Sequence, residues 1–283
     1  MTAPGTDWYQ ERWAGEGSAI ALEITARLHD HQSPYQRVEV FETTRFGRLL
    51  TLDGLVMVTG RDNHIYHEML AHPALYACPD PRRVLIIGGG DCGTLTEVLR
   101  HPGVQHVDMV ELDEAVTQAA ELYFPELTAG RRDARAHLRF EDGIAFAARA
   151  PAGSYDVILV DSTDPVGPAE GLFGEAFFRS CVNALTPHGV LATQSESPLF
   201  HADLIVQVHG ALRAAGFAHT ASVHFPQCTY PSGWWSVTLG ARTGRADACR
   251  APDALPFATR YYNAALHRGA LALPQALRER LPA

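Results

Sequence analysis

The pattern of apolar and polar positions changes once along the chain. Residues 36–59 are rich in Val, Leu, Thr and Phe, and Asp53-Gly54 separates two apolar runs. An Asp-Gly pair between apolar runs is typical of a tight β-hairpin, so we predict a small antiparallel sheet in the N-terminal part. A helix-like stretch follows at 64–77. The proline-containing segment 78–83 then marks a change of character.

From Val84 onward, apolar runs alternate with helix-like stretches. Runs such as residues 157–160 are continuously apolar, which is typical of a parallel sheet covered on both faces. The last two strand candidates, 219–225 and 234–241, have no helix between them, and we expect them to close the sheet as an antiparallel pair. The pattern predicts an α/β chain with an N-terminal β domain at 1–78 and a Rossmann-like domain at 79–283.

Composition narrows the class of protein. The chain has 283 residues, is 46% hydrophobic and carries a formal net charge of -9, which argues against a nucleic-acid or anionic-membrane partner. Five widely spaced cysteines form no C-x-x-C motif, so neither a disulfide framework nor a zinc knuckle is indicated. The N-terminus lacks a basic segment leading into an apolar one, and no long apolar run occurs. We expect a cytoplasmic protein outside the membrane.

A glycine-rich turn follows the first strand of the second domain. Gly88, Gly90 and Gly93 fit G-x-G-x-x-G between a predicted strand and a predicted helix, and Glu111 ends the next strand. Such a turn holds a nucleoside, and the acidic side chain can bind its ribose diol. This pattern alone leaves open whether the ligand is NAD or a sulfonium nucleoside. The same glycines could also serve only helix packing.

Asp91 lies inside this glycine turn. A pyrophosphate would rest on the turn and on the helix N-terminus, where a carboxylate would repel it. A cationic ligand reverses that argument. The alternative role for Asp91 is a helix cap that accepts hydrogen bonds from nearby backbone amides.

Two further acids follow the apolar run at 157–160. Asp161 and Asp164 lie at the carboxyl end of this predicted strand, where open α/β sheets bind ligands, so we expect them to share a crevice with Asp91. Three acids without a nearby Lys or Arg indicate a positively charged ligand, a metal ion or a proton-transfer role.

A metal site is the weaker of these alternatives. His64 and His67 have a possible ligand spacing, but histidines on an apolar helix are usually structural. Asp142, at another predicted strand end, suits an adenine amino group, although Asp142-Gly143 is also an ordinary turn.

Several longer motifs carry a family resemblance. The segments "SPYQ", "LDG", "YHEML", "IGGGDCG", "VELDE", "EDGIAF", "VDSTDPVGPAEGLF", "TQSESP" and "TYPSGWW" occur in this order over almost the whole chain. Together they resemble the spermidine synthases of the polyamine aminopropyltransferase family. The resemblance implies a small β domain, a methyltransferase-like Rossmann domain and a homodimer. It also implies two small-molecule substrates, decarboxylated S-adenosylmethionine and putrescine, and neither a metal nor a redox cofactor.

The same resemblance implies roles for individual residues. Asp161 would be the catalytic proton acceptor, with Asp164 beside it on the amine. The nucleoside would be held by Gln36, Gly88, Gly90, Glu111, Asp142, Gly143 and Pro168. The amine would be bound by Tyr66, His67, Asp91, Ser162, Thr163 and Tyr230, together with the two acids.

Two positions depart from the family pattern. Cys92 replaces a glycine and puts a thiol next to the nucleoside loop, and Asn63 replaces an acid that we place near the mouth of the amine channel. The choice among putrescine, cadaverine, agmatine and spermidine therefore stays open. A methyltransferase or NAD-linked dehydrogenase would share the glycine turn without needing the acids. A catalytically silent binding module would usually have lost an acid of "VDSTDP".

Overall fold

The structure is a computed structural model that describes residues 7–164 and 167–281. The N-terminal part is a five-stranded antiparallel sheet with strands in sequence order. Its strands are β1 (Asp7–Trp13), β2 (Ser18–Gln32), β3 (Arg37–Thr43), β4 (Arg48–Leu52) and β5 (Leu55–Thr59). Asp53 and Gly54 join β4 to β5 with φ of 49° and 82°, the left-handed pair that a tight hairpin requires. The predicted hairpin is confirmed.

The second sheet has seven strands in the order β11-β12-β10-β9-β6-β7-β8. They are β6 (Arg83–Gly88), β7 (His106–Glu111), β8 (Ala136–Phe140), β9 (Tyr155–Asp161), β10 (Leu185–Gln194), β11 (His219–Pro226) and β12 (Trp234–Ala241). Strands β8, β7, β6, β9 and β10 are parallel, whereas β12 runs antiparallel to both of its neighbours. The expected antiparallel closing pair is therefore confirmed.

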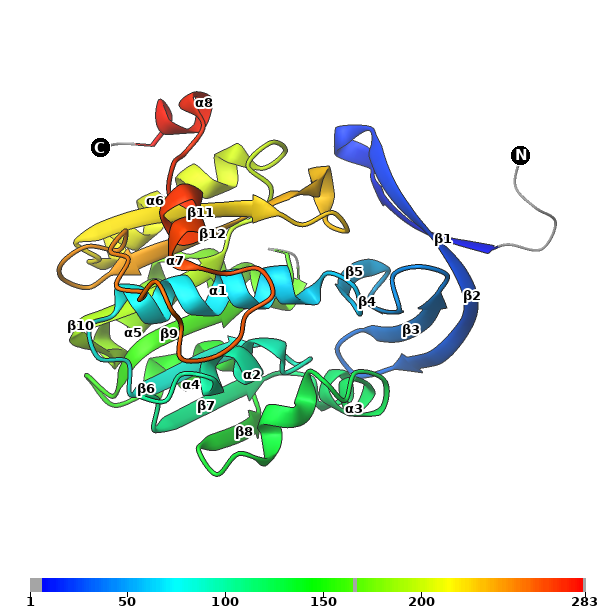
Figure 1. The fold of residues 1–283 in the computed structure, drawn as a ribbon, viewed down its shortest axis with the longest axis horizontal. Coiled ribbons are helices and arrows are strands. Elements are labelled where there is room, and N and C mark those ends of the chain that lie inside the picture. The colour runs from blue at the N-terminus through cyan, green and yellow to red at the C-terminus, as the bar shows by residue number, and fades with distance from the viewer. Residues whose placement is uncertain (1–6, 165–166, 282–283) are drawn as a thin grey trace.

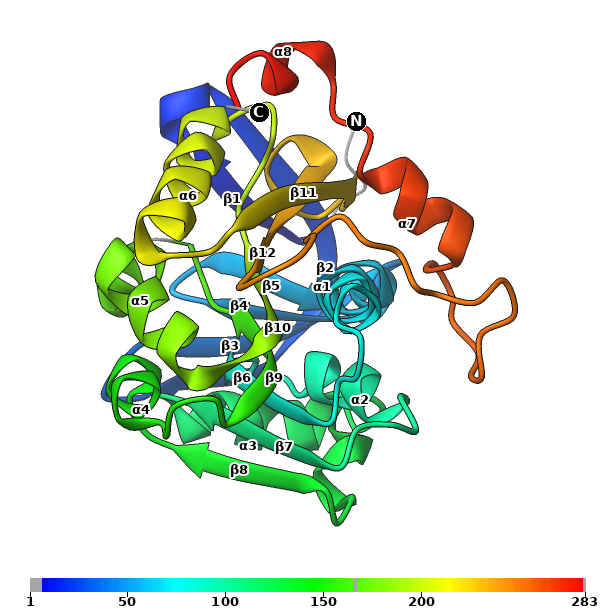
Figure 2. The same ribbon diagram turned by 90° about the vertical axis from the view of Figure 1, so that its left-hand side faces the viewer.

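Helices cover both faces of this large sheet. Figure 2 shows α4, α5 and α6 on one side of the strands and α1 and α2 on the other. The helices are α1 (Asn63–Ala77), α2 (Gly93–Leu99), α3 (Glu114–Tyr123), α4 (Gly143–Arg149), α5 (Glu175–Ala184), α6 (Ala202–Ala215), α7 (Ala264–Ala270) and α8 (Gln275–Arg278). Short 3-10 turns are η1 (Ala14–Glu16), η2 (Thr128–Arg132), η3 (Gly167–Phe173) and η4 (Pro231–Gly233). The predicted Rossmann-like architecture is confirmed.

Helix α1 connects the two sheets but packs with the second one. Its buried residues, among them Met69, Leu70 and Leu75, share a hydrophobic core with strands of the large sheet. Figure 1 shows α1 running from the end of β5 across the large sheet. The boundary that we predicted at residue 78 assigns α1 to the N-terminal domain, whereas its packing groups it with the Rossmann-like domain.

The order of the strands decides where a ligand can bind. Strand β6 lies between β9 and β7, and the chain leaves β6 towards β7 and β8 before it returns to β9 and β10. Loops therefore diverge at the carboxyl ends of β6 and β9 and leave a crevice between them. The small sheet lies beside that end of the large sheet (Figure 1).

Candidate active site

The glycine turn after β6 packs directly on the end of β9. Gly88 has a φ of +81°, and a Cβ at this position would lie 2.2 Å from the carbonyl oxygen of Asp161. The next residue, Gly89, donates its N–H to that same carbonyl at 2.8 Å. Only glycine allows this approach, which brings the turn bearing Asp91 to the strand end bearing Asp161.

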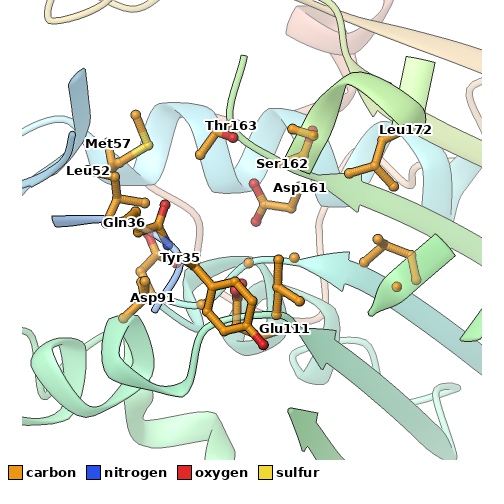
Figure 3. A pocket seen from close by; sticks show the side chains of 18 of the residues that line it. Tyr35, Gln36, Leu52, Met57, Asp91, Glu111, Asp161, Ser162, Thr163 and Leu172 are labelled. Atoms are coloured by element: carbon orange, nitrogen blue, oxygen red, sulfur yellow. The ribbon is translucent and has the colours of Figure 1, made fainter. Parts of the chain in front are cut away.

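One pocket collects almost all of the predicted site residues. Figure 3 shows Gln36, Glu111 and Asp161, from three separate segments, around this cavity. Its lining includes Gln36, Tyr66, His67, Gly88, Gly90, Asp91, Glu111, Asp142, Gly143, Asp161, Ser162, Thr163 and Tyr230. Asp164 lies just beyond this lining. The side chain of Pro168, in η3, is outside the described part of the structure.

Asp161 ends β9 and is held by two hydroxyl donors. Tyr66 donates its hydroxyl to Oδ1 at 2.8 Å, and Thr94 donates to Oδ2 at 2.6 Å. Burial and the negative charge of Asp91 raise the pKa of Asp161, and the charge of His67 and the two hydroxyl donors oppose that shift. The result is a partly buried carboxyl whose basicity is above that of an ordinary aspartate.

Asp91 has a cationic partner that we did not expect. Its Oδ2 lies 3.1 Å from Nε2 of His67, and its Oδ1 accepts the N–H of Gly93 at 2.8 Å. Burial alone would lower the pKa of His67, but the charge and hydrogen bond of Asp91 outweigh it and raise the pKa to about 9. The pKa of Asp91 is lowered, because His67 and Gly93 outweigh the effect of burial. Asp91 is thus both a helix-terminal acceptor and half of an ion pair.

Gly93 makes room for this ion pair. A Cβ at Gly93 would lie 2.1 to 2.5 Å from atoms of the His67 ring. The third glycine of the motif therefore permits α1 and α2 to approach until His67 reaches Asp91.

Two tyrosines line the side of the pocket that carries Asp161. The rings of Tyr66 and Tyr230 meet edge to face, with centroids 5.7 Å apart. Burial first, and then the charge of Asp161, raises the pKa of both phenols well above the ordinary value, so both stay protonated donors. Tyr230 donates its hydroxyl to the carbonyl of Met57 in β5, which joins the Rossmann-like domain to the small sheet.

The opposite side of the pocket carries acceptors suited to a nucleoside. Glu111 ends β7, and burial raises its pKa to about 7. Gln36 comes from the small sheet, immediately before β3. Asp142 caps α4 by accepting the N–H groups of Ile144 and Ala145 on Oδ1, and it also lines the pocket. The ordinary turn role and the pocket position of Asp142 are therefore compatible.

A second group of acids lies beyond Thr163. Burial and the neighbouring Glu196 raise the pKa of Asp164 to about 9, with a smaller contribution from Glu11. His201, the residue before α6, lies 3.0 Å from Glu196. The neighbouring Glu196 carboxylate is the main reason that the pKa of His201 is raised.

Some of these residues were missed in the sequence. Thr94 directly follows the glycine motif, and Glu196 lies within "TQSESP", but neither was singled out. Glu11 lies in a stretch without a motif. Tyr35, which is half-exposed on the pocket lining, belongs to "SPYQ". Among the described residues, no three or more His, Cys, Asp or Glu side chains are arranged to hold a metal ion.

The two departures from the family pattern have separate explanations. Cys92 is fully buried before α2 at a φ of 65°, a left-handed conformation that glycine adopts at lower cost. We expected Asn63 near the mouth of the amine channel, but it does not line the pocket. It is buried and donates a hydrogen bond from Nδ2 to the carbonyl of Thr59 at 2.7 Å.

Over the part of the chain that is described, no helix is long and apolar enough to cross a bilayer.

Comparison with known proteins agrees with this geometry. Residues 63–247 match the "Spermine/spermidine synthase domain" family, and residues 7–60 match the "Spermidine synthase tetramerisation domain" family. The two matches meet before α1, in line with its packing on the large sheet. The chain is 52% identical to the polyamine aminopropyltransferase of Thioalkalivibrio sulfidiphilus, over 97% of each chain. It is 53% identical to that of Methylococcus capsulatus, over 96% of this chain and 98% of the relative.

Solved structures are similar over nearly the same length. A spermidine synthase in complex with the transition state analogue AdoDATO superimposes with a TM-score of 0.92 at 32% identity, over 97% of this chain and 94% of the other. The spermidine synthase of Thermotoga maritima has a TM-score of 0.89 at 32% identity, over 97% of this chain and 93% of the other. The chain therefore belongs to the spermidine synthase family of polyamine aminopropyltransferases.

Proposed function

We propose that this enzyme transfers the aminopropyl group of decarboxylated S-adenosylmethionine to putrescine, with Asp161 as the proton acceptor. The products are spermidine and 5'-methylthioadenosine. The observation that carries the proposal is a partly buried carboxyl of raised pKa, Asp161, at the junction between acceptors for a nucleoside and acids for an amine. The similarity to a spermidine synthase that binds AdoDATO supports the same substrate class.

The nucleoside half of the donor occupies the side of the pocket with Gln36, Glu111 and Asp142. Glu111 and Gln36 accept from the ribose hydroxyls, and Asp142 accepts from the adenine amino group. The turn at Gly88 and Gly90 lets the ligand approach the backbone closely. This arrangement puts the sulfonium beside Asp91 and Asp161, where positive charge is stabilised.

The reaction is a direct displacement. The nitrogen lone pair of the amine attacks the methylene carbon next to sulfur, the carbon–sulfur bond breaks, and its electron pair stays on sulfur as a neutral thioether. An ordinary alkylammonium has a pKa of about 10.4, so having it neutral at pH 7 costs about 4.6 kcal/mol. Asp161 removes that proton, and its raised pKa brings its basicity closer to that of the amine.

The other end of the diamine is a cation and needs acids. Asp164 and Glu196 lie beyond Thr163, and Glu11 of the small sheet is near them. The distal ammonium binds here and replaces the proton that Asp164 holds because burial and Glu196 raise its pKa. Tyr66 and Tyr230 contact the chain between the two nitrogens and align the attacking one.

The same acids discriminate between forms of the donor. The carboxylate of ordinary S-adenosylmethionine would face Asp91 or Asp161, and two unit charges 4 Å apart interact by about 4 kcal/mol at an effective dielectric near 20. The decarboxylated form has a hydrogen in place of the carboxylate, keeps only the amine and so avoids this repulsion.

The proposal also covers cofactors, oligomeric state and location in the cell. The displacement uses neither a metal nor a redox cofactor, because the sulfonium is already an activated leaving group. We propose a homodimer in the cytoplasm, where both substrates are small soluble molecules. The match of residues 7–60 to a tetramerisation domain supports self-association through the small sheet.

The test is release of methylthioadenosine by purified protein given decarboxylated S-adenosylmethionine. Putrescine, cadaverine, agmatine and spermidine are supplied in parallel, and the protein without amine is the control. We expect the fastest release with putrescine. Silence with every amine, from a folded protein that binds S-adenosylmethionine more tightly than methylthioadenosine, would contradict the proposal and favour a methyltransferase.

A further inference from the structure

Asp113 is a buried acid that touches the pocket only through other residues. It is 2% exposed, precedes α3 and does not line the pocket. Its Oδ1 accepts the N–H of Ala115 at 3.1 Å, as an ordinary helix cap does. Its Oδ2 accepts the hydroxyl of Ser33 at 2.6 Å and Nε2 of Gln36 at 3.1 Å. Asp113 therefore joins α3 of the Rossmann-like domain to the small sheet.

The segment bound by Asp113 is the turn between β2 and β3. Oγ of Ser33 accepts the N–H groups of Tyr35 and Gln36, each at 3.0 Å, and the N–H of Ser33 donates to the carbonyl of Gln36 at 3.0 Å. The turn is thus closed on itself and fastened to Asp113. Tyr35 and Gln36 both line the pocket, so this attachment brings the small sheet into the site.

Asp113 also holds the second nucleoside acceptor. Its backbone N–H donates to Oε1 of Glu111 at 2.8 Å. The other oxygen of Glu111, Oε2, points towards Gly90, where an added Cβ would lie 3.0 Å from it. One residue therefore orients Gln36 through its side chain and Glu111 through its backbone.

The orientation of the Gln36 amide follows from the chemistry of its partner. A side-chain amide has one end that accepts and one that donates, and the two ends are similar in shape. An ionised carboxylate only accepts, so the NH2 group of Gln36 must face Asp113 and its carbonyl oxygen is left for the pocket. With a partner at position 113 that could also donate, either orientation of the amide would be allowed.

We propose that Asp113 is a positioning residue of the nucleoside site, which fixes the Gln36 amide so that its carbonyl oxygen accepts from the ligand beside Glu111. This inference rests on the proposed function, because it concerns how the same nucleoside is bound. It also links binding to domain docking: a nucleoside that needs Gln36 binds fully only when the small sheet lies against α3.

The test uses methylthioadenosine binding by calorimetry and steady-state kinetics of Asp113→Asn. Asn is as good a helix cap as Asp, so the substitution keeps the cap and removes only the obligatory acceptor. We expect a dissociation constant about tenfold higher, a similar rise in KM for the donor, and kcat and the KM for the amine within twofold. The measurements are made at pH 8.5, where Glu111, with a pKa of about 7, is ionised. Asp133→Asn, at the partly buried contact with Arg135 and outside the pocket lining, is the control and leaves every constant unchanged.

A double-substitution cycle separates this role from a general structural one. Gln36→Ala should weaken binding about tenfold, and Asp113→Asn should add less than twofold in the Gln36→Ala background. The inference would be overturned if the double variant bound about a hundredfold more weakly than wild type, so that the two tenfold effects multiply. It would also be overturned if Asp113→Asn kept the wild-type dissociation constant. If Asp113→Asn does not fold, Ser33→Ala tests the same turn, and wild-type binding there counts against it. A wild-type protein that neither binds nor releases methylthioadenosine would instead contradict the proposed function.

Discussion

One group of acids lines the pocket and a second group lies next to it, and their surroundings differ. At the reaction end, Asp161 accepts from Tyr66 and Thr94, and Asp91 pairs with His67. At the far end, Asp164 faces another carboxyl, Glu196, and its pKa is raised to about 9. The first group contains its own donors and its own cation. In the second group His201 lies 3.0 Å from Glu196, whereas Asp164 has no such cation and holds a proton at neutral pH.

This difference indicates different tasks. An acid that must accept a proton during the reaction has to be ionised and fixed before the substrate arrives. Acids that bind a cation can remain protonated until the cation displaces the proton. His67 keeps Asp91 charged without leaving the reaction end strongly negative. The glycine motif thus supports both the nucleoside and, through Gly93, the position of His67.

The largest effect is expected at the reaction end. Asp161→Asn should lower kcat about 10² to 10⁴-fold, because it removes the proton acceptor and retains the shape of the side chain. The residual rate should rise with pH, up to about tenfold per unit, because solvent must then supply the neutral amine. Steady-state rates of methylthioadenosine release between pH 7 and 10 test this. Near-normal turnover in Asp161→Asn, with loss of activity in Asp91→Asn, would assign the base to Asp91 instead.

At Asp164 we expect a smaller effect, on the KM for putrescine rather than on kcat. Asp164→Asn should raise the KM for putrescine about 10 to 100-fold, as for the loss of one hydrogen bond to a charged group, and change kcat much less. Glu196→Gln should act in the same direction. The KM for decarboxylated S-adenosylmethionine serves as the internal control and should not change. A collapse of kcat at unchanged KM would remove the distinction between the two groups of acids.

The smallest effect concerns the pH dependence of stability. Between about pH 4 and pH 9, Asp164 is protonated in the folded chain and ionised in the unfolded chain. The unfolded state then binds fewer protons, so the free energy of unfolding falls as pH rises across this window. Asp164→Asn removes that dependence, and its Tm should exceed the wild-type value by a few degrees at pH 9 and by less at pH 5.

His67 requires a separate account in this experiment. Its pKa is raised to about 9, so the stability that its charge contributes is complete below about pH 6.5 and is lost as pH rises through 9. Because the loss occurs equally in wild type and Asp164→Asn, the difference between the two melting curves isolates Asp164. The exposed Asp203→Asn is the control substitution. If the difference in Tm between wild type and Asp164→Asn stayed the same across the pH range, Asp164 and Glu196 would not share a proton.

The parallel strands of the large sheet and the β4–β5 hairpin of the small sheet could be predicted well because their signals are local. The buried parallel strands are continuous apolar runs, and the Asp53-Gly54 hairpin depends on two residues with positive φ. The sequence pattern did not distinguish β1 and β2 of the small sheet as separate strands. In β2 only Leu22 is fully buried, so a 15-residue strand shows no clear alternation. Its register comes from pairing with β1 and β3 rather than from its own pattern.

The sequence alone determined the class of fold, the glycine turn and most acids of the pocket, because strand periodicity, glycine spacing and residue chemistry are local properties. Only the tertiary structure decided which side chain is the partner of each acid. His67 meets Asp91 across two helices, Glu196 meets Asp164 from separate strand ends, and Asp113 meets Gln36 from the other domain. The ionisation of an acid depends on burial and on charges within a few ångströms, and those neighbours are brought together by the fold.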